Sequence, residues 1–270
     1  MFGPSTKLTD GMPKEFDHIR FRIEDRVARI TFARMPLNVF NIAMMREMSE
    51  ALNDCLPVRD LAAIVFDAAP GTRAFSAGVA VEEHVPETVF QMLDSFHGVF
   101  RMLAQISRPV IALVDGPALG GGCELVAACD IVIASERARF GQPEIKLGVF
   151  PPVAAILLPR VIGEKRAREL IMLGDMIDAA EALRLGLVNY VVPAVELEPK
   201  LQSVLAKIRD LSAAALAMTR AALDLGGQSG FQSALTEIEN LYLNELMKTE
   251  DANEGVRSFI EKRKPEWRHK

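Results

Sequence analysis

The sequence predicts an α/β fold with a largely parallel sheet, followed by a helical C-terminal part. Three apolar runs of strand length, at residues 61–68, 109–115 and 130–135, alternate with longer segments whose apolar residues recur at helical spacing. Strands separated by helices are typical of crossover units, in which helices cover a parallel sheet. We expect a loop over 136–148, and an almost entirely helical chain from Pro152 onward.

A hairpin and a helix precede the first of these runs. Residues 19–34 alternate apolar and polar on both sides of a Glu-Asp pair, which is the pattern of a two-stranded hairpin. Residues 42–56 carry apolar side chains at helical intervals, and Asn41 is placed to cap that helix. A further helix is expected over 87–106.

Composition excludes several classes of protein. The chain has 270 residues, half of them hydrophobic, and a net charge of -5, which argues against a broad nucleic-acid surface. No apolar run reaches the roughly 18 residues that a membrane span needs. The three cysteines form no Cys-x-x-Cys pair, so neither a zinc site nor a disulfide framework is indicated. Residues 1–14 resemble a flexible lead-in more than a signal peptide, and we expect a cytoplasmic protein.

The stretch GPALGGGCEL places three glycines directly before Cys123 and Glu124. A phosphate-binding P-loop needs Lys and Ser or Thr where Gly122 and Cys123 stand. The dinucleotide fingerprint, counted from Gly120, needs glycine where Leu125 stands. Both nucleotide interpretations therefore fail, and Cys123 is expected to be a packed thiol.

Two interpretations of the glycines remain open on the residues alone. A strand ending at Asp115 and a helix beginning near Gly121 would direct free backbone N–H groups at one point, where the helix dipole adds positive charge. Such donors stabilise a developing oxyanion, and one donor is worth ~3–4 kcal/mol in the transition state. Alternatively, the glycines only let the helix pack closely on the strand.

Three motifs resemble those of the crotonase family, the enoyl-CoA hydratases and isomerases. They are FSAGVAVEE (75–83), ALGGGCELVAACDIVIASERARFGQPEIKLG (118–148) and FIEKRKPEW (259–267). The resemblance implies the ClpP/crotonase fold of stacked ββα units, with a spiral core over 15–205 that holds the acyl-CoA site. It also implies a helical region over 206–270 for assembly into a trimer or a dimer of trimers.

The same resemblance implies the catalytic groups. The N–H groups of Val79 and Gly121 would hold the thioester oxygen, and Glu124 and Glu144 would act on the acyl chain. Two carboxyl groups of different pKa can hold a water between them, one accepting its proton while the other supplies a proton to carbon. We favour Glu124 as the base and Glu144 as the proton donor. Coenzyme A would be part of the substrate, so no separate cofactor or metal is expected.

Further residues are expected to contact the substrate by the same resemblance. Some lie beside the two N–H groups, some form the wall of the acyl pocket, and two basic residues would contact coenzyme A phosphates, often from a neighbouring subunit. They are Ala77, Gly78 and Gly120, then Phe150 and Pro151, then Lys262 and Lys264.

The chain departs from the common family pattern at two places. Ala80 stands where an aspartate is usual, and residues 149–154 read VFPPVA where a glycine-rich loop is usual. A stiff apolar wall suits a bulky carbocyclic acyl group, and these stretches resemble the cyclohexa-1,5-diene-1-carbonyl-CoA hydratases of anaerobic benzoyl-CoA degradation. The alternatives are a straight-chain enoyl-CoA hydratase or isomerase of fatty-acid β-oxidation and, more remotely, a non-catalytic RNA-binding homologue.

Overall fold

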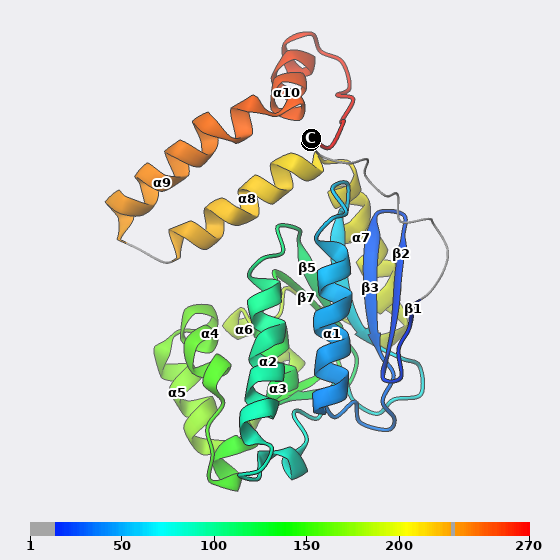
Figure 1. The fold of residues 1–270 in the computed structure, drawn as a ribbon, viewed down its shortest axis with the longest axis vertical. Helices are drawn as coiled ribbons and strands as arrows, with labels where there is room; N and C mark the ends of the chain where they lie inside the picture. The colour runs from blue at the N-terminus through cyan, green and yellow to red at the C-terminus, as the bar shows by residue number, and fades with distance from the viewer. Residues whose placement is uncertain (1–13, 228–229) are drawn as a thin grey trace.

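A seven-stranded sheet organises the N-terminal part of the molecule, and the computed structural model describes residues 14–227 and 230–270 (Figure 1). Its strand order is β1-β2-β3-β4-β5-β7-β10. The strands are β1 (Lys14–Glu15), β2 (Ile19–Glu24), β3 (Val27–Phe32), β4 (Ala63–Ala68), β5 (Val110–Val114), β7 (Ile131–Ser135) and β10 (Tyr190–Val192). Pairing is antiparallel from β1 to β3 and parallel from β3 to β10, so the largely parallel sheet predicted from the apolar runs is confirmed.

The predicted hairpin is formed by β2 and β3, joined at Asp25 and Arg26. Both residues have positive φ, 48° and 63°, which is the backbone of a turn whose twist matches that of the flanking strands. Pairing of Ile19 with Phe32 fixes the register, so that Ile30 and Phe32 are fully buried on one face of the sheet.

A second, three-stranded sheet was not predicted. Strand β8 (Arg139–Gly141) lies between β6 (Pro117–Leu119), which is parallel to it, and β9 (Met176–Asp178), which is antiparallel. The segment 136–148 is therefore not only a loop, because it contains β8 and the 3-10 helix η2 (Pro143–Leu147). The chain after Pro152 also contributes β9 and β10 to the sheets, which corrects the expectation of an almost entirely helical remainder.

Helices cover both faces of the main sheet and continue beyond it (Figure 1). One hydrophobic core contains buried residues of α1, α2 and α3, and the other joins the opposite face to α7. The α-helices are α1 (Ile42–Cys55), α2 (Val89–Leu103), α3 (Gly121–Ala127), α4 (Pro152–Ile162), α5 (Glu164–Leu173), α6 (Ala179–Leu185), α7 (Leu197–Arg209), α8 (Ala213–Gly226), α9 (Phe231–Asn244) and α10 (Glu250–Ile260). The remaining 3-10 helices are η1 (Val81–His84), η3 (Ala194–Glu196) and η4 (Leu246–Lys248). Asn41 caps α1 as predicted, since its side chain accepts a hydrogen bond from the N–H of Met44.

The C-terminal helices α8 and α9 run beside each other and extend away from the sheets (Figure 1). The boundary expected between 205 and 206 falls inside α7, whose Leu201 and Leu205 belong to the core under the sheet. Of the expected lead-in over 1–14, only Lys14 lies within the described residues, where it pairs in β1. Within 14–227 and 230–270, no helix is long and apolar enough to cross a membrane.

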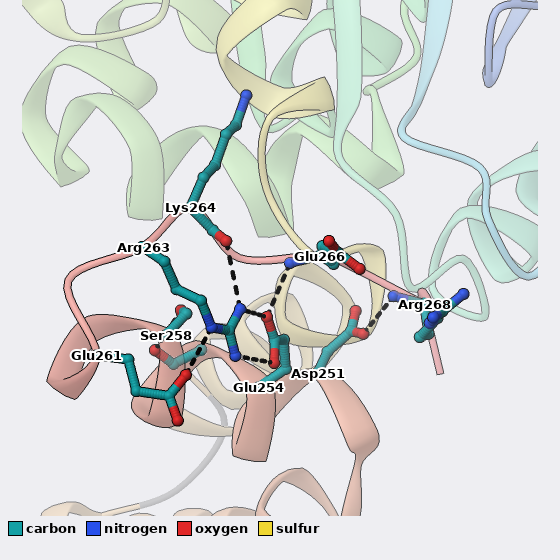
Figure 2. Close-up of polar contacts among 9 residues, drawn as sticks. Asp251, Glu254, Ser258, Glu261, Arg263, Lys264, Glu266 and Arg268 are labelled. Carbon is teal, nitrogen blue, oxygen red and sulfur yellow. Dashed lines mark hydrogen bonds and ion pairs between the residues drawn. The ribbon is translucent and has the colours of Figure 1, made fainter.

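Polar contacts hold the last residues of the chain against α10 (Figure 2). The carboxylate of Asp251, which is buried, accepts hydrogen bonds from Ser212 Oγ and from the N–H groups of Arg268 and His269. The Glu254 carboxylate accepts two more from the Arg263 guanidinium, at 2.5 and 2.9 Å. These two acids on one helix therefore fix the path of the tail.

Candidate active site

Two neighbouring parallel strands end at the same place and carry both glutamates there. Strands β6 and β8 pair with Leu119 opposite Gly141, and the N–H of Gly120 donates to the carbonyl of Gly141 at 2.9 Å. After β6 the chain enters α3, which carries Glu124, and after β8 it enters η2, which carries Glu144. The missed second sheet is thus what brings the two carboxyl groups together.

A third segment, residues 76–79, lies between Phe40 and the end of β6. Its Ser76 pairs with Ala118 on one side, and Val79 pairs with Phe40 on the other. In the second pairing, Phe40 donates to the carbonyl of Gly78 and accepts from the N–H of Ala80. The N–H of Val79 is therefore directed away from Phe40, toward the side on which the β6 segment lies.

The N–H groups of Val79 and Gly121 lie close together and have no acceptor among the described residues. A Cβ placed on Gly121 would lie 2.9 Å from Cγ2 of Val79, and one placed on Gly78 would lie 3.5 Å from the nitrogen of Gly121. Gly121 is the first residue of α3, whose first-turn N–H groups have no partner within the helix. Two neighbouring free donors at a helix start can bind an oxyanion.

Each of the three glycines contacts a different neighbour. A Cβ on Gly120 would lie 2.5 Å from Oε1 of Glu144, and one on Gly122 would lie 2.8 Å from both Cβ and the carbonyl oxygen of Ser76. For Gly121 the second obstacle, beside Val79, is Cζ of Phe96 at 2.9 Å. Close packing, the second interpretation of the glycines, is therefore also present, and it is what keeps the two free N–H groups adjacent.

Glu124 is buried and is held by the start of helix α4. Its Oε1 accepts a 2.7 Å hydrogen bond from the N–H of Ala154, and the N–H of Val153 also interacts with the carboxylate. Pro152, at the first position of α4, has no N–H, so the next two amides are the donors that this helix end offers. Burial raises the pKa of Glu124 to about 8, and the two amides partly oppose that rise.

The two carboxyl groups interact with each other. Charge on Glu144 contributes to the raised pKa of Glu124, so the two groups are close enough to influence each other's ionisation. Glu144 is half-buried, and burial raises its pKa to about 7. Two coupled carboxyls with raised pKa values titrate as a pair near neutral pH.

Comparison with known proteins identifies the family of this chain. Residues 22–270 match the model of the family described as enoyl-CoA hydratase/isomerase. The chain belongs to the enoyl-CoA hydratase/isomerase family. A cyclohexa-1,5-dienecarbonyl-CoA hydratase of Thauera aromatica is 38% identical over 242 residues, covering 90% of this chain and 93% of the relative. A short-chain-enoyl-CoA hydratase of Clostridium acetobutylicum is 36% identical over 259 residues, covering 93% and 98%.

Solved structures of the enoyl-CoA hydratase/isomerase family show the same fold. An enoyl-CoA hydratase of Geobacillus kaustophilus superposes with a TM-score of 0.91 at 26% identity, covering 96% of this chain and 99% of that one. One from Bacillus anthracis gives 0.88 at 32% identity, covering 94% and 100%. The crotonase fold expected from the three motifs is therefore confirmed.

The segment that departs from the common family pattern forms the wall beside Glu124. Pro151 is buried and precedes α4, Pro152 opens it, and the Phe150 side chain is 68% exposed. Ala80 is 6% exposed and packs at the end of the segment that carries Val79. Ala77 is partly exposed and Gly78 is buried in that segment. The start of α4 thus places a helix end with fixed N–H groups beside Glu124.

The structure does not bring Lys262 and Lys264 to this site within one chain. Both are exposed and follow α10, at the opposite end of the molecule from α3 (Figure 1). The side chain of Lys264 extends away from the contacts made by Arg263, one of which is to the backbone carbonyl of Lys264 (Figure 2). A role toward coenzyme A therefore stays a prediction, and it requires a neighbouring subunit.

Two other polar features of the described residues lie outside this site. Asp17, His18 and Glu47 have ligand atoms close enough for a metal ion. The Glu47 carboxylate, however, already accepts hydrogen bonds from the N–H groups of residues 17–19 and contacts His18 Nδ1 at 2.9 Å, so it ties the start of β2 to α1. A broad groove along β2, β3 and the start of α7 is lined by residues that include neither Glu124 nor Glu144.

Sequence reasoning missed two contributors to the site. The N–H groups of Val153 and Ala154 hold Glu124, and the side chain of Gln142 lies at the Glu144 carboxylate. Backbone donors leave no mark in a side-chain pattern, although Pro152 ahead of an apolar helical run is a signal of a helix start. Gln142 lies in the GQPE stretch, two residues before Glu144, and no role was predicted for it from the motif.

Proposed function

We propose that the protein adds water to an α,β-unsaturated acyl-CoA thioester. The observation that carries this proposal is the placement of Glu124 and Glu144 beside the free N–H groups of Val79 and Gly121. The two N–H groups hold the thioester oxygen, where negative charge collects when water attacks the β carbon. Family membership supports the thioester as the substrate class.

Between the two pKa values of the glutamate pair, the pair carries one proton. The ionised member accepts a proton from water, whose oxygen bonds to the β carbon, and the protonated member returns a proton to carbon. We keep Glu124 as the base and Glu144 as the proton donor. The pKa of about 8 for Glu124 and about 7 for Glu144 puts the proton on Glu124 in the empty pair, so this assignment requires the proton to pass to Glu144 once water and substrate are bound.

Replacing each glutamate by glutamine tests the chemistry. Glu144→Gln should lower turnover of crotonyl-CoA by orders of magnitude and leave binding of the CoA ester within a few-fold of the original value. It should also abolish exchange of solvent deuterium into the substrate at carbon, whereas Glu124→Gln should block addition of water. Original turnover by Glu144→Gln would remove that residue from the mechanism.

We further propose that the acyl group is a cyclic diene, cyclohexa-1,5-diene-1-carbonyl-CoA, which becomes 6-hydroxycyclohex-1-ene-1-carbonyl-CoA. Water adds β to the thioester, electrons spread through the dienolate, and a proton returns at the far end of the conjugated system. The stiff wall of Pro151 and Pro152, the apolar Phe150 and the Thauera relative support this substrate. The Clostridium relative supports the straight-chain alternative at similar identity.

A panel of CoA esters distinguishes these substrates. The ratio of kcat/KM for the cyclic diene to that for crotonyl-CoA should exceed ten, with a product heavier by one water. Equal or better turnover of crotonyl-CoA would overturn the cyclic assignment and leave hydration intact. A product of unchanged mass would indicate a double-bond isomerase.

We also propose that the chain assembles as a homotrimer or a dimer of trimers through α8 to α10. Large apolar side chains on these helices are exposed in the single chain: Leu223 at 73%, Phe231 at 81%, Leu243 at 63%, Phe259 at 84% and Ile260 at 71%. A surface of this kind is typical of an interface between copies. Light scattering of the intact protein tests it, with Phe231→Asp expected to release monomers and a monomeric parent protein contradicting it.

A further inference from the structure

The side chain of Ser76 is fully buried and makes two hydrogen bonds near the Val79 donor. Its Oγ donates to the carbonyl of Asn38 at 2.8 Å, and it accepts from the N–H of Gly78 at 3.1 Å. A serine hydroxyl has a single hydrogen. Because that hydrogen is directed at Asn38, the lone pairs of Oγ remain for the N–H of Gly78.

Both the serine and its acceptor are held by other contacts. The N–H of Ser76 donates to the carbonyl of Pro117 at 3.2 Å, and its carbonyl accepts from the N–H of Leu119 at 2.9 Å, so β6 fixes the backbone of the serine. Asn38 is fully buried, and its Nδ2 donates to the carbonyl of Ala74 at 3.0 Å. The Ser76 hydroxyl therefore connects two segments that are each fixed on their own.

Gly78 needs such a contact from outside its own backbone. Glycine has no Cβ, so it rotates more freely than other residues, and here its φ is 98°. The peptide after it carries both the Gly78 carbonyl, which accepts from the N–H of Phe40 at 2.8 Å, and the N–H of Val79 on the opposite side. One hydrogen bond at the carbonyl leaves this peptide free to rotate about that bond. The bond from Gly78 to Ser76 limits the rotation.

We propose that Ser76 is a positioning residue, whose hydroxyl directs the N–H of Val79 at the thioester oxygen. This inference rests on the proposed hydration. Without the hydroxyl, the buried N–H of Gly78 loses its acceptor, and the glycine is free to turn the next peptide. The N–H of Ala77 still donates to the carbonyl of Leu37 at 3.0 Å, so the segment as a whole stays in place. Loss of the hydroxyl should therefore change the direction of one donor more than it changes the fold.

A role in packing alone would require only part of this side chain. A Cβ on Gly122 would lie 2.8 Å from Cβ of Ser76 and 3.2 Å from its Oγ, so the serine does fill the space beside α3. Alanine keeps the Cβ that makes the closer of these contacts. Ser76→Ala thus retains most of the packing and removes both hydrogen bonds of the hydroxyl.

The test of Ser76→Ala observes the thioester oxygen itself. Butanoyl-CoA is saturated and cannot take up water, and ¹³C at its thioester carbonyl identifies the C=O stretching band of the bound ester in an infrared difference spectrum. Hydrogen bonds to the oxygen lower this frequency, and the lowering should be smaller in Ser76→Ala than in the original protein. The kcat for crotonyl-CoA should fall about tenfold or more, because the donor is misaligned, while KM stays within about twofold.

Ser135 provides a matched control. It is fully buried at the end of β7, and its Oγ accepts from the N–H of Arg137 at 3.2 Å, the same spacing of two residues as in the bond from Gly78 to Ser76. Ser135→Ala should lower the midpoint of urea unfolding, as Ser76→Ala does. It should leave kcat and the carbonyl band of bound butanoyl-CoA unchanged.

The outcomes separate this inference from the hydration proposal. A folded Ser76→Ala whose bound ester keeps the original carbonyl frequency would overturn the role of Ser76. If Ser76→Ala does not fold, Ser76→Cys keeps the shape of the side chain with a weaker acceptor, and the same criterion applies to it. The band does not depend on turnover, so it reports on the donors even if water addition is not the reaction. An original protein that does not lower the frequency would contradict the oxyanion site and this inference together.

Discussion

The N–H of Ala154 donates a 2.7 Å hydrogen bond to Oε1 of Glu124, across 30 residues of chain. A carboxylate of one helix is thereby the acceptor for the first turn of another. Pro152 at the start of α4 has no N–H, and the N–H of Ala154 is one of the first that the helix leaves without a partner of its own. The Glu124 carboxylate accepts from it, and the same bond orients the side chain proposed to act on water. The stability of α4 and the proposed catalysis therefore depend on one bond.

Shortening the Glu124 side chain should lower both the stability of the protein and its kcat, by amounts that can be measured separately. In Glu124→Asp the carboxylate no longer reaches the N–H of Ala154, so the free energy of unfolding should fall by about 1–3 kcal/mol, because a buried donor loses its partner. Misplacement of the carboxylate should lower kcat by about 10²-fold. Urea unfolding and steady-state kinetics measure both quantities.

A helix cap outside the site provides the control. Asp178 caps α6 by accepting from the N–H of Glu181 at 2.8 Å. Asp178→Ala should lower stability by about 0.5–2 kcal/mol and leave kcat unchanged. Unchanged kcat in Glu124→Asp would contradict the assigned role.

Adding one methyl group at Gly121 should disturb the two donors directly. The new Cβ would lie 2.9 Å from Val79 Cγ2 and from Phe96 Cζ, so Val79 must move away. Loss of one aligned donor should lower kcat by about 10²–10³-fold. Kinetics of Gly121→Ala measure this, with binding of the CoA ester followed by calorimetry.

The matched change is Gly98→Ala, in the middle of α2. A Cβ there would meet only Ser49 Oγ, at an ordinary 3.8 Å. This variant should keep kcat and gain up to about 1 kcal/mol of stability, since alanine is the better helix former. Equal kinetics of the two variants would argue against an oxyanion role for Gly121.

The coupled carboxyls predict a bell-shaped pH dependence. Burial raises the pKa of Glu144 to about 7 and that of Glu124 to about 8, so both are protonated well below this range and both are ionised well above it. The singly protonated pair is most abundant between the two values. The kcat/KM of the free enzyme should peak there and fall on both sides, and a flat profile from about pH 6 to 9 would contradict the paired mechanism.

The C-terminal tail should respond to acid through His269. Its Nδ1 accepts from Arg26 and from the N–H of Ala213, both at 3.3 Å, which only an unprotonated nitrogen can do. Burial, then the charges of Arg26 and Arg108, lower its pKa below the ordinary 6.5, against Asp251 and Asp60. The stability from neutral His269 is therefore complete above about pH 6.5 and is lost as pH falls through the lowered pKa.

Trp267 is the single tryptophan and reports on this docking. Its Nε1 donates to the carbonyl of Asp210 at 2.8 Å. Its fluorescence should shift to the red below pH 6.5 in the original protein. The shift should be absent in His269→Asn, which keeps an acceptor that does not titrate, and the same shift in both proteins would exclude His269 as its cause.

The sequence contained the larger part of the fold, because long apolar runs and helical spacing reflect burial in the main sheet and its helices. The hairpin, the Asn41 cap and the parallel order are confirmed. The second sheet was missed because β6, β8 and β9 have three residues each, too few for a periodic pattern. Their pairing joins residues far apart in sequence, as Phe140 with Ala118 and Ile177 shows.

The same distinction between patterned and unpatterned residues applies to the candidate site. Residues that carry a recognisable motif, such as Glu124 and Glu144, were named from the sequence, and the structure brings them together. The N–H of Ala154 could not be named, since any residue except proline offers that donor. The orientation of the Gln142 amide depends on groups on both sides of it, which only a three-dimensional arrangement defines.

The three glycines also determine where this enzyme can be altered by laboratory evolution. Any chiral residue at Gly120, Gly121 or Gly122 would collide with an acid, an aromatic ring or a scaffold serine, respectively. Libraries that randomise this triplet should yield almost no active clones. Changes in acyl-group preference are to be sought instead at Val149 and Phe150, whose exposed side chains leave room for replacement.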